Sequence, residues 1–313
     1  MLLISMLPFF MGIFIASQTA INSRLTSYNH LPLVTSTISF AIGALFLAIL
    51  TICSGQSIGI SLGMIAKTPW WSWLGGLTAA FALTCNILLF KYLGSVEATL
   101  YPVIGQIITS LIIDQFGWFG SLRQEMTGNK ALGAGLLILG LLIFIDLLGF
   151  HRTSAEAGSK KSSRLLWQAL GILAGGALAI QNAVNAELGK AFHSPLHASF
   201  VSFSISFLIL LAFNLLHKVR LIKVIRQTLL SQNPREWWIW LGGLLGSSYV
   251  GLSSVLVPVL GTGQVVILAL FGQLVFSALI QQFGWFKSRV IKMTRLQGMG
   301  TVLMFVGILL IKA

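Results

Sequence analysis

Ten long apolar stretches occupy most of this sequence, and they constrain its fold more than any other feature. They cover residues 3–23, 33–53, 71–91, 99–115, 131–149, 166–186, 197–217, 238–257, 264–281 and 296–312. A helix needs about 20 apolar residues to cross the hydrocarbon core of a bilayer. Of the 313 residues, 56% are hydrophobic and only 9% are charged, which leaves too few polar groups to cover a soluble domain. We therefore predict an all-α membrane protein with ten transmembrane helices.

The second half of the chain repeats the first. The segment Gln18-Thr-Ala-Ile-Asn22 recurs as Gln181-Asn-Ala-Val-Asn185, 163 residues later. Three further motifs recur at a spacing of 167 residues: Trp-Trp-x-Trp-Leu-Gly-Gly at 70–76 and 237–243, Gly-Gln at 105–106 and 272–273, and Phe-Gly-Trp-Phe at 116–119 and 283–286. A generally apolar composition would not align tryptophan, glycine and glutamine in this way, so we infer an internal duplication.

Each copy contains five predicted helices, and this odd number determines how the copies are oriented. The second copy must enter the membrane from the side opposite to the first. The two copies are then related by a pseudo-two-fold axis in the membrane plane. We predict a first five-helix repeat over 1–150, a basic linker over 151–165 and an inverted second repeat over 166–313.

Lysine and arginine are distributed unevenly between the two sides of this predicted bundle. The side that holds both chain ends carries only five of the 20, namely Lys67, Arg123, Lys130, Lys190 and Lys312. The positive-inside rule then places the N- and C-termini outside the cell and linker 151–165 in the cytoplasm, for a multi-pass protein of the plasma membrane. A basic amphipathic loop on the cytoplasmic side is expected to contact anionic lipid through Lys218, Arg220, Lys223 and Arg226.

Seven amide side chains lie within the predicted spans and are candidates for substrate binding: Gln18, Asn22, Asn86, Gln106, Gln181, Asn185 and Gln273. Residues four apart share one helix face, so Gln18 lies above Asn22, and Gln181 above Asn185. The inverted topology places the first four amides in the cytoplasmic half and the other three toward the outside. This predicts two polar clusters. A second interpretation fits equally well, in which the amides only form hydrogen bonds that join helices.

Two acidic residues border the fourth span and are candidates for a proton-coupling group. Glu97 precedes the span and Asp114 ends it, and their counterparts in the second copy are Gln264 and Gln281. A buried carboxyl group would have a raised pKa and could exchange protons. The alternatives are an exposed loop carboxylate for Glu97 and an interfacial residue for Asp114.

The sequence contains no HExxH or phosphate-loop motif and no cluster of carboxylates. We therefore predict no enzymatic activity, no catalytic residue, no metal site and no cofactor. The basic residues lie between apolar runs rather than in one patch, so nucleic-acid binding is not expected either.

Together, these motifs resemble the drug/metabolite transporter superfamily, whose architecture is EamA-like. Within it the chain is similar to the YdcZ-like family of unknown function, in a fused form. The resemblance covers nearly the whole chain and implies a transporter of the bacterial inner membrane that moves a small polar or amphipathic solute by alternating access. A passive channel, and a scaffold or lipid-interacting protein, are the alternatives, and a homodimer is also considered. The small multidrug resistance branch uses a glutamate in its first helix, where this chain offers only Gln18.

Overall fold

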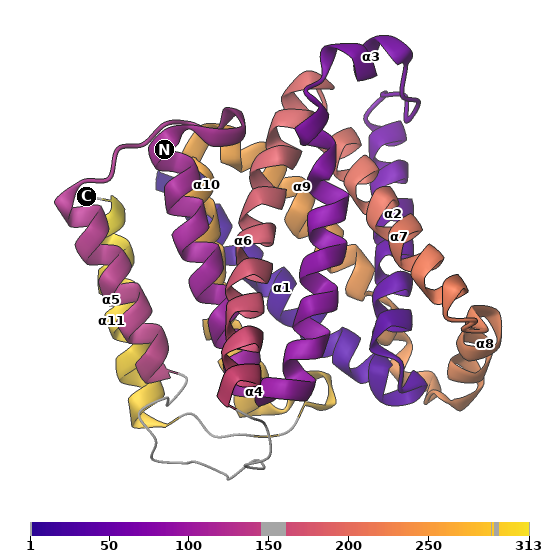
Figure 1. Ribbon diagram of the computed structural model, residues 1–313. Helices are drawn as coiled ribbons and strands as arrows, with labels where there is room; N and C mark the ends of the chain where they lie inside the picture. The colour runs from indigo at the N-terminus through magenta and orange to yellow at the C-terminus, as the bar shows by residue number, and fades with distance from the viewer. Residues whose placement is uncertain (1, 145–160, 289, 291–293, 313) are drawn as a thin grey trace.

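The computed structural model describes residues 2–144, 161–288, 290 and 294–312, and all regular structure in this part of the chain is helical (Figure 1). The first repeat comprises α1 (Leu2–Asn29), α2 (Pro32–Cys53), α3 (Leu62–Lys67), η1 (Trp70–Leu74), α4 (Gly75–Phe116), η2 (Trp118–Gly120) and α5 (Gly128–Phe144). The second comprises α6 (Lys161–Ala191), α7 (Pro195–Leu216), α8 (Leu221–Ser231), η3 (Pro234–Trp240), α9 (Gly242–Leu260), α10 (Thr262–Phe283), η4 (Trp285–Lys287) and α11 (Arg295–Lys312). The predicted all-helical class is confirmed.

Six of the described helices are long and apolar enough to cross a membrane: α1, α2, α6, α7, α9 with the preceding η3, and α10. The apolar segments Gly128–Phe144 and Arg295–Ile311 are shorter. The total of ten crossings therefore stays a prediction. Of the predicted linker, residues 151–160 lie outside the described part of the chain, and α6 already begins at Lys161.

Helix α4 differs from the sequence prediction, which has two spans at 71–91 and 99–115 with a loop between them. The structure is helical throughout Gly75–Phe116, but the helix turns back on itself. Its first arm follows α6 downward, from Gly75 beside Asn185 to Leu89 beside Gly171. The second arm returns along α6. It starts with Pro102 beside Gly175, and Gly120, just after the end of the helix, lies beside Glu187 of α6. Figure 1 shows the two arms joined at the bottom of the view. The two predicted spans thus correspond to the two arms of one bent helix.

Each repeat is completed by helices of the other. Helix α1 packs on α9 and α10, and its counterpart α6 packs on the two arms of α4. Helix α2 pairs with α7, and α5 pairs with α11. The short helices α3 and α8 occupy equivalent places in the two repeats, yet Figure 1 shows them at opposite ends of the bundle, as an inverted repeat requires. We call these ends the α3 end and the α8 end.

Glycines allow the helices of different repeats to come into backbone contact. A Cβ atom added to Gly272 on α10 would lie 1.9 Å from the carbonyl oxygen of Phe9 on α1. In the other repeat, a Cβ on Gly105 would lie 2.0 Å from the carbonyl oxygen of Ile172. These glycines open the two repeated Gly-Gln motifs. The motif therefore marks a place where the backbones of the two repeats meet and no side chain fits.

The repeated Phe-Gly-Trp-Phe motif ends the helices α4 and α10. Gly117 and Gly284 both adopt the left-handed conformation with φ of 64°, which glycine adopts without strain. The chain then turns so that Phe119 meets Trp71 and Phe286 meets Trp238, with ring centroids 5.4 and 5.5 Å apart. The motif thus ties each helix end to the tryptophan segment of its own repeat.

We expect Gly272→Ala to lower the thermal unfolding midpoint of the purified protein in detergent. The new methyl group would overlap the backbone of Phe9, and overpacking of this kind costs about 1–3 kcal/mol. Gly135→Ala on α5 is the matched control, because a Cβ there meets nothing within 4 Å. Equal midpoints for the two variants would contradict the proposed helix contact.

Candidate functional site

The inner faces of α1 and α6 are equivalent in sequence but differ in burial. Gly12 lies against α10, so the face of α1 that it shares with Thr19 and Ser23 points into the bundle. Thr19 and Ser23 are nevertheless exposed. Their counterparts on α6, Asn182 and Ala186, are both 3% exposed. The inner face is therefore buried in the second half of α6 and exposed in the second half of α1.

The same difference separates α10 from the second arm of α4. On α4, three polar residues one turn apart are buried: Gln106, Ser110 and Asp114. Their counterparts on α10 become more exposed toward the helix end, with Gln273 and Ser277 half-buried and Gln281 exposed. The buried residues run toward the α3 end and the exposed ones toward the α8 end. Equivalent side chains on these helices are thus buried at the α3 end and more exposed at the α8 end.

A buried polar network closes the packed end. The Asn182 amide of α6 donates a hydrogen bond to the Tyr249 hydroxyl of α9 at 3.4 Å and accepts one from Ser253 at 3.2 Å. Ser199 of α7 contacts Ser254 through their hydroxyls, 3.2 Å apart. These bonds hold α9 against α6 and α7.

The first repeat lacks this network. Its equivalent positions carry Thr19, Ala82 and Asn86. Thr19 donates to the carbonyl of Ile15 in its own helix, at 2.8 Å. The side-chain oxygen of Asn86 is buried and has no hydrogen-bond partner. An unpaired amide oxygen in an apolar bundle can accept a hydrogen bond from a polar solute.

A carboxylate joins the two repeats at the α3 end. Oδ1 of Asp114 accepts the backbone N–H of Thr262 at 2.8 Å, and Oδ2 accepts that of Gly263 at 2.7 Å. Ser121 also donates to Oδ1, at 3.1 Å. The first N–H groups of a helix have no partner within it, and the helix dipole favours a negative charge there. We call this set of bonds between α4 and α10 the Asp114 latch.

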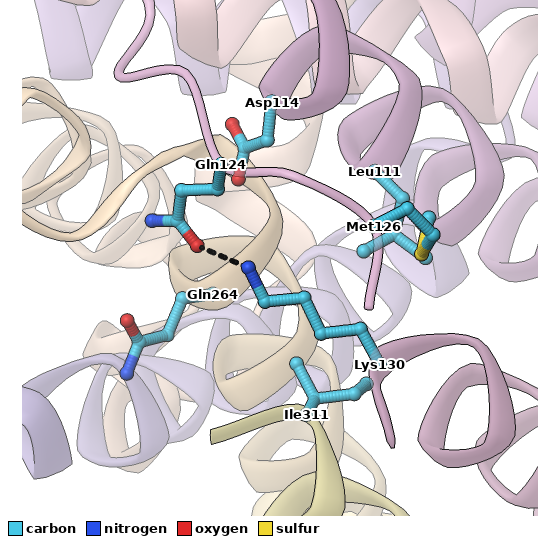
Figure 2. A pocket seen from close by; sticks show the side chains of 7 residues that line it. All are labelled: Leu111, Asp114, Gln124, Met126, Lys130, Gln264 and Ile311. Atoms are coloured by element: carbon cyan, nitrogen blue, oxygen red, sulfur yellow. Dashed lines mark hydrogen bonds between the residues drawn. The ribbon is translucent and has the colours of Figure 1, made fainter. Parts of the chain in front are cut away.

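Figure 2 shows the small pocket beside the latch, which is lined by Leu111, Asp114, Gln124, Met126, Lys130, Gln264 and Ile311. Gln124 donates to the carbonyl of Leu260 at 2.7 Å, and Lys130 donates to the Gln124 oxygen at 3.4 Å. The loop after α4 is thereby bound to the junction between α9 and α10. At the α8 end, the counterpart of Asp114 is Gln281, whose side chain forms no hydrogen bond within the described residues.

The predicted site residues Asn22 and Asn185 pack against glycines of the opposite repeat. The oxygen of Asn22 accepts a hydrogen bond from Ser39 at 2.7 Å and lies over Gly242. Asn185 lies over Gly75 in the same way, but its amide is fully buried and has no hydrogen-bond partner. Their surroundings favour a role in helix packing.

The predicted glutamines on α1 and α6 differ in burial, as other residues of these helices do. Gln18 lies over Gly246 and is half-buried, whereas its counterpart Gln181 is buried. Gln106 and Gln273 follow the two contact glycines. No hydrogen bond within the described residues joins any two of the seven amides. The side chain of Glu97 lies outside the described residues. The network residues Asn182 and Tyr249 were not predicted, although Asn182 directly follows Gln181 in the repeated motif.

Over residues 3–143 and 166–310, the chain matches the protein family described as "Putative inner membrane exporter, YdcZ". The two matched segments are the two repeats. The chain belongs to this family. The match confirms the resemblance seen in the sequence. It identifies the chain as a multi-pass protein of the inner membrane. The family is one of transporters and is not an enzyme family.

Solved structures support the same fold. One, titled "Crystal structure of protein", aligns over 98% of this chain and 96% of its own length, with a TM-score of 0.65 and 14% sequence identity. At this identity the likeness concerns the fold alone. No curated protein matches the sequence.

We expect Asn182→Ala to lower the thermal unfolding midpoint more than Thr19→Ala does. Asn182 bonds to Tyr249 and Ser253 across two helices, whereas Thr19 bonds only within its own helix. Interhelical polar bonds in membrane proteins contribute about 0.6–1.7 kcal/mol each. Thermal unfolding of both variants in one detergent tests this, and equal shifts would show that the network does not hold the packed end.

Proposed function

We propose that this YdcZ exporter is a secondary transporter that moves a small polar or amphipathic solute by alternating access. The observation that carries the proposal is the difference between equivalent residues in the two repeats. Ser23 is exposed while Ala186 is buried, and Gln281 is exposed while Asp114 is buried. Two copies of one sequence pattern therefore adopt two arrangements in one molecule. In an inverted-repeat transporter, exchange of these arrangements opens the opposite end.

The described arrangement then corresponds to a state that is open at the α8 end. We place the α8 end in the cytoplasm, which the excess of lysine and arginine on that side supports. An exporter in this state would load its solute from the cytoplasm. The open face offers the hydroxyls of Thr19, Ser23 and Ser277 and the amide of Gln273. These neutral donors and acceptors suit hydroxyl, amide or amine groups on a solute.

Asp114 is the group we propose for control of the outward-facing end. Opening that end separates α4 from α10 and breaks the bonds from Thr262 and Gly263 to the carboxylate. Protonation of Asp114 would weaken these bonds, because charge-assisted hydrogen bonds are about twice as strong as neutral ones. At the symmetry-related position of the other end, Gln281 takes the place of Asp114 and Glu97 takes the place of Gln264. The pair at each end then contains one carboxyl group, and Glu97 would act when the cytoplasmic end closes.

Cysteine labelling tests the two-state proposal. In a Cys53→Ser background, we expect an aqueous maleimide to label Ser23→Cys quickly and Ala186→Cys slowly, because only the first site is exposed. Adding Asp114→Asn should speed labelling at 186 about tenfold and slow it at 23, since charged hydrogen bonds contribute about 1.5–3 kcal/mol. Labelling in the parent Cys53→Ser background is the control for Cys85, which is buried.

Three results would contradict the two-state proposal or the role of Asp114 in it. Equal labelling rates at residues 23 and 186 would show that the two ends are equally open in the membrane. If Asp114→Asn leaves both rates unaltered, Asp114 does not control the gate. A faster rate at both positions would indicate general loosening of the fold and would also contradict a latch.

A ligand screen tests the amide site. We expect a transported amine, sugar, amino acid or nucleoside to raise the unfolding midpoint, because it binds the native state. Gln106→Ala combined with Gln273→Ala should abolish this shift, while Gln227→Ala, on the exposed face of α8, should retain it. Reconstituted vesicles then measure flux: saturation and counterflow support a transporter, and flux that never saturates supports a channel. Full binding and flux in a correctly inserted double variant would exclude these glutamines from the site.

A further inference from the structure

Helix α8 has a buried face and an exposed face. Leu221, Val224 and Ile225 pack on the end of α1 and the start of α2. Thr228 completes this buried face. On the outer side Ile222 is 85% exposed and Leu230 is 78% exposed. Large apolar side chains with this exposure at the end of a membrane bundle are suited to the boundary between headgroups and acyl chains.

The exposed face of α8 also carries positive charge. Lys223 and Arg226 are exposed on the helix, and Lys218 and Arg220 are exposed just before it. Among the side chains that the structure describes, the acid near this helix is Glu236. Both of its oxygens are bound by Arg24, at 2.7 and 2.9 Å. The four cations therefore have no protein carboxylate beside them in the described part of the chain.

The inverted counterpart of α8, helix α3, has a similar exposed apolar surface but fewer cations. Helix α3 occupies the equivalent place at the other end of the bundle and exposes Leu62 and Ile65. Between Ser54 and Lys67, the sole charged residue is Lys67. Both short helices thus present apolar side chains at the edge of the bundle, but cations accompany them at one end. Packing alone would not require this difference, whereas two leaflets of different charge would.

We propose that α8 is a docking site for anionic lipid headgroups. Ile222 and Leu230 enter the acyl region, and Lys218, Arg220, Lys223 and Arg226 bind phosphate groups of lipids such as phosphatidylglycerol. The positions of Lys223 and Arg226, one turn apart beside Leu230, allow one lipid to meet both charges. Because α8 also packs on α1, bound lipid would hold the cytoplasmic end of that helix in place. The proposal does not depend on the identity of the transported solute.

The test measures unfolding midpoints of the full chain in detergent with added dioleoylphosphatidylglycerol or dioleoylphosphatidylcholine. We expect the anionic lipid to raise the midpoint more than the zwitterionic one. Each cation near an anionic surface contributes about fivefold in affinity, so Lys223→Gln with Arg226→Gln should weaken binding of the anionic lipid about 25-fold. Lys67→Gln with Arg123→Gln, which removes two charges at the α3 end, is the matched control and should bind normally.

Inorganic phosphate separates the two sources of the effect, a free anion and a lipid headgroup. A midpoint raised equally by phosphate would show an anion site rather than a lipid site and would overturn the proposal. Equal effects of the two lipids would also overturn it and would direct attention to an acidic protein partner. As a readout independent of stability, a fluorophore on Ile222→Cys in the Cys53→Ser background should be quenched more strongly by brominated phosphatidylglycerol than by brominated phosphatidylcholine.

Discussion

Backbone contact between helices of different repeats is the interaction on which this structure depends. Lipid offers no hydrophobic force to press helices together, so association relies on close packing and small residues. Gly272 and Gly105 allow α10 to touch α1 and α4 to touch α6 at the level of the main chain. The neighbouring glutamines follow these two glycines, and the pairs α2–α7 and α5–α11 add further contacts between the repeats.

The two contacts are alike, but the chain beyond them is not. At one end Asp114 accepts hydrogen bonds from the N-terminus of α10 and Asn182 bonds to Tyr249. Both residues are buried there. At the other end the equivalent residues are Gln281 and Thr19, and the same faces are exposed. A duplicated chain thus contains, within one molecule, both packing arrangements that a transport cycle would exchange.

Much of the fold could be predicted because apolar length and repeated motifs depend on local sequence. The helices, the two repeats and the family were all accessible from spans and from motifs such as Phe-Gly-Trp-Phe. Residues 92–98 were predicted as a loop because Gly94, Ser95 and Glu97 interrupt the apolar pattern, yet the helix continues through them. Periodicity also identifies the face that carries Gln18 and Asn22 but not the helix opposite it. The partner of Asn182 is Tyr249, whose counterpart is Ala82, so comparison of the repeats gave no sign of this bond.

The interlocking of the repeats has a consequence for how the protein is made. The first helix to leave the ribosome, α1, packs mainly on α9 and α10, which are among the last. Until some 250 further residues have been synthesised, its glycine face has no protein neighbour of its own. Contacts between residues so distant in sequence form slowly, and a chain that waits for them is exposed to wrong partners. Assembly of this bundle is therefore a late event, in which the second repeat closes around a helix that the first has held in the lipid from the start.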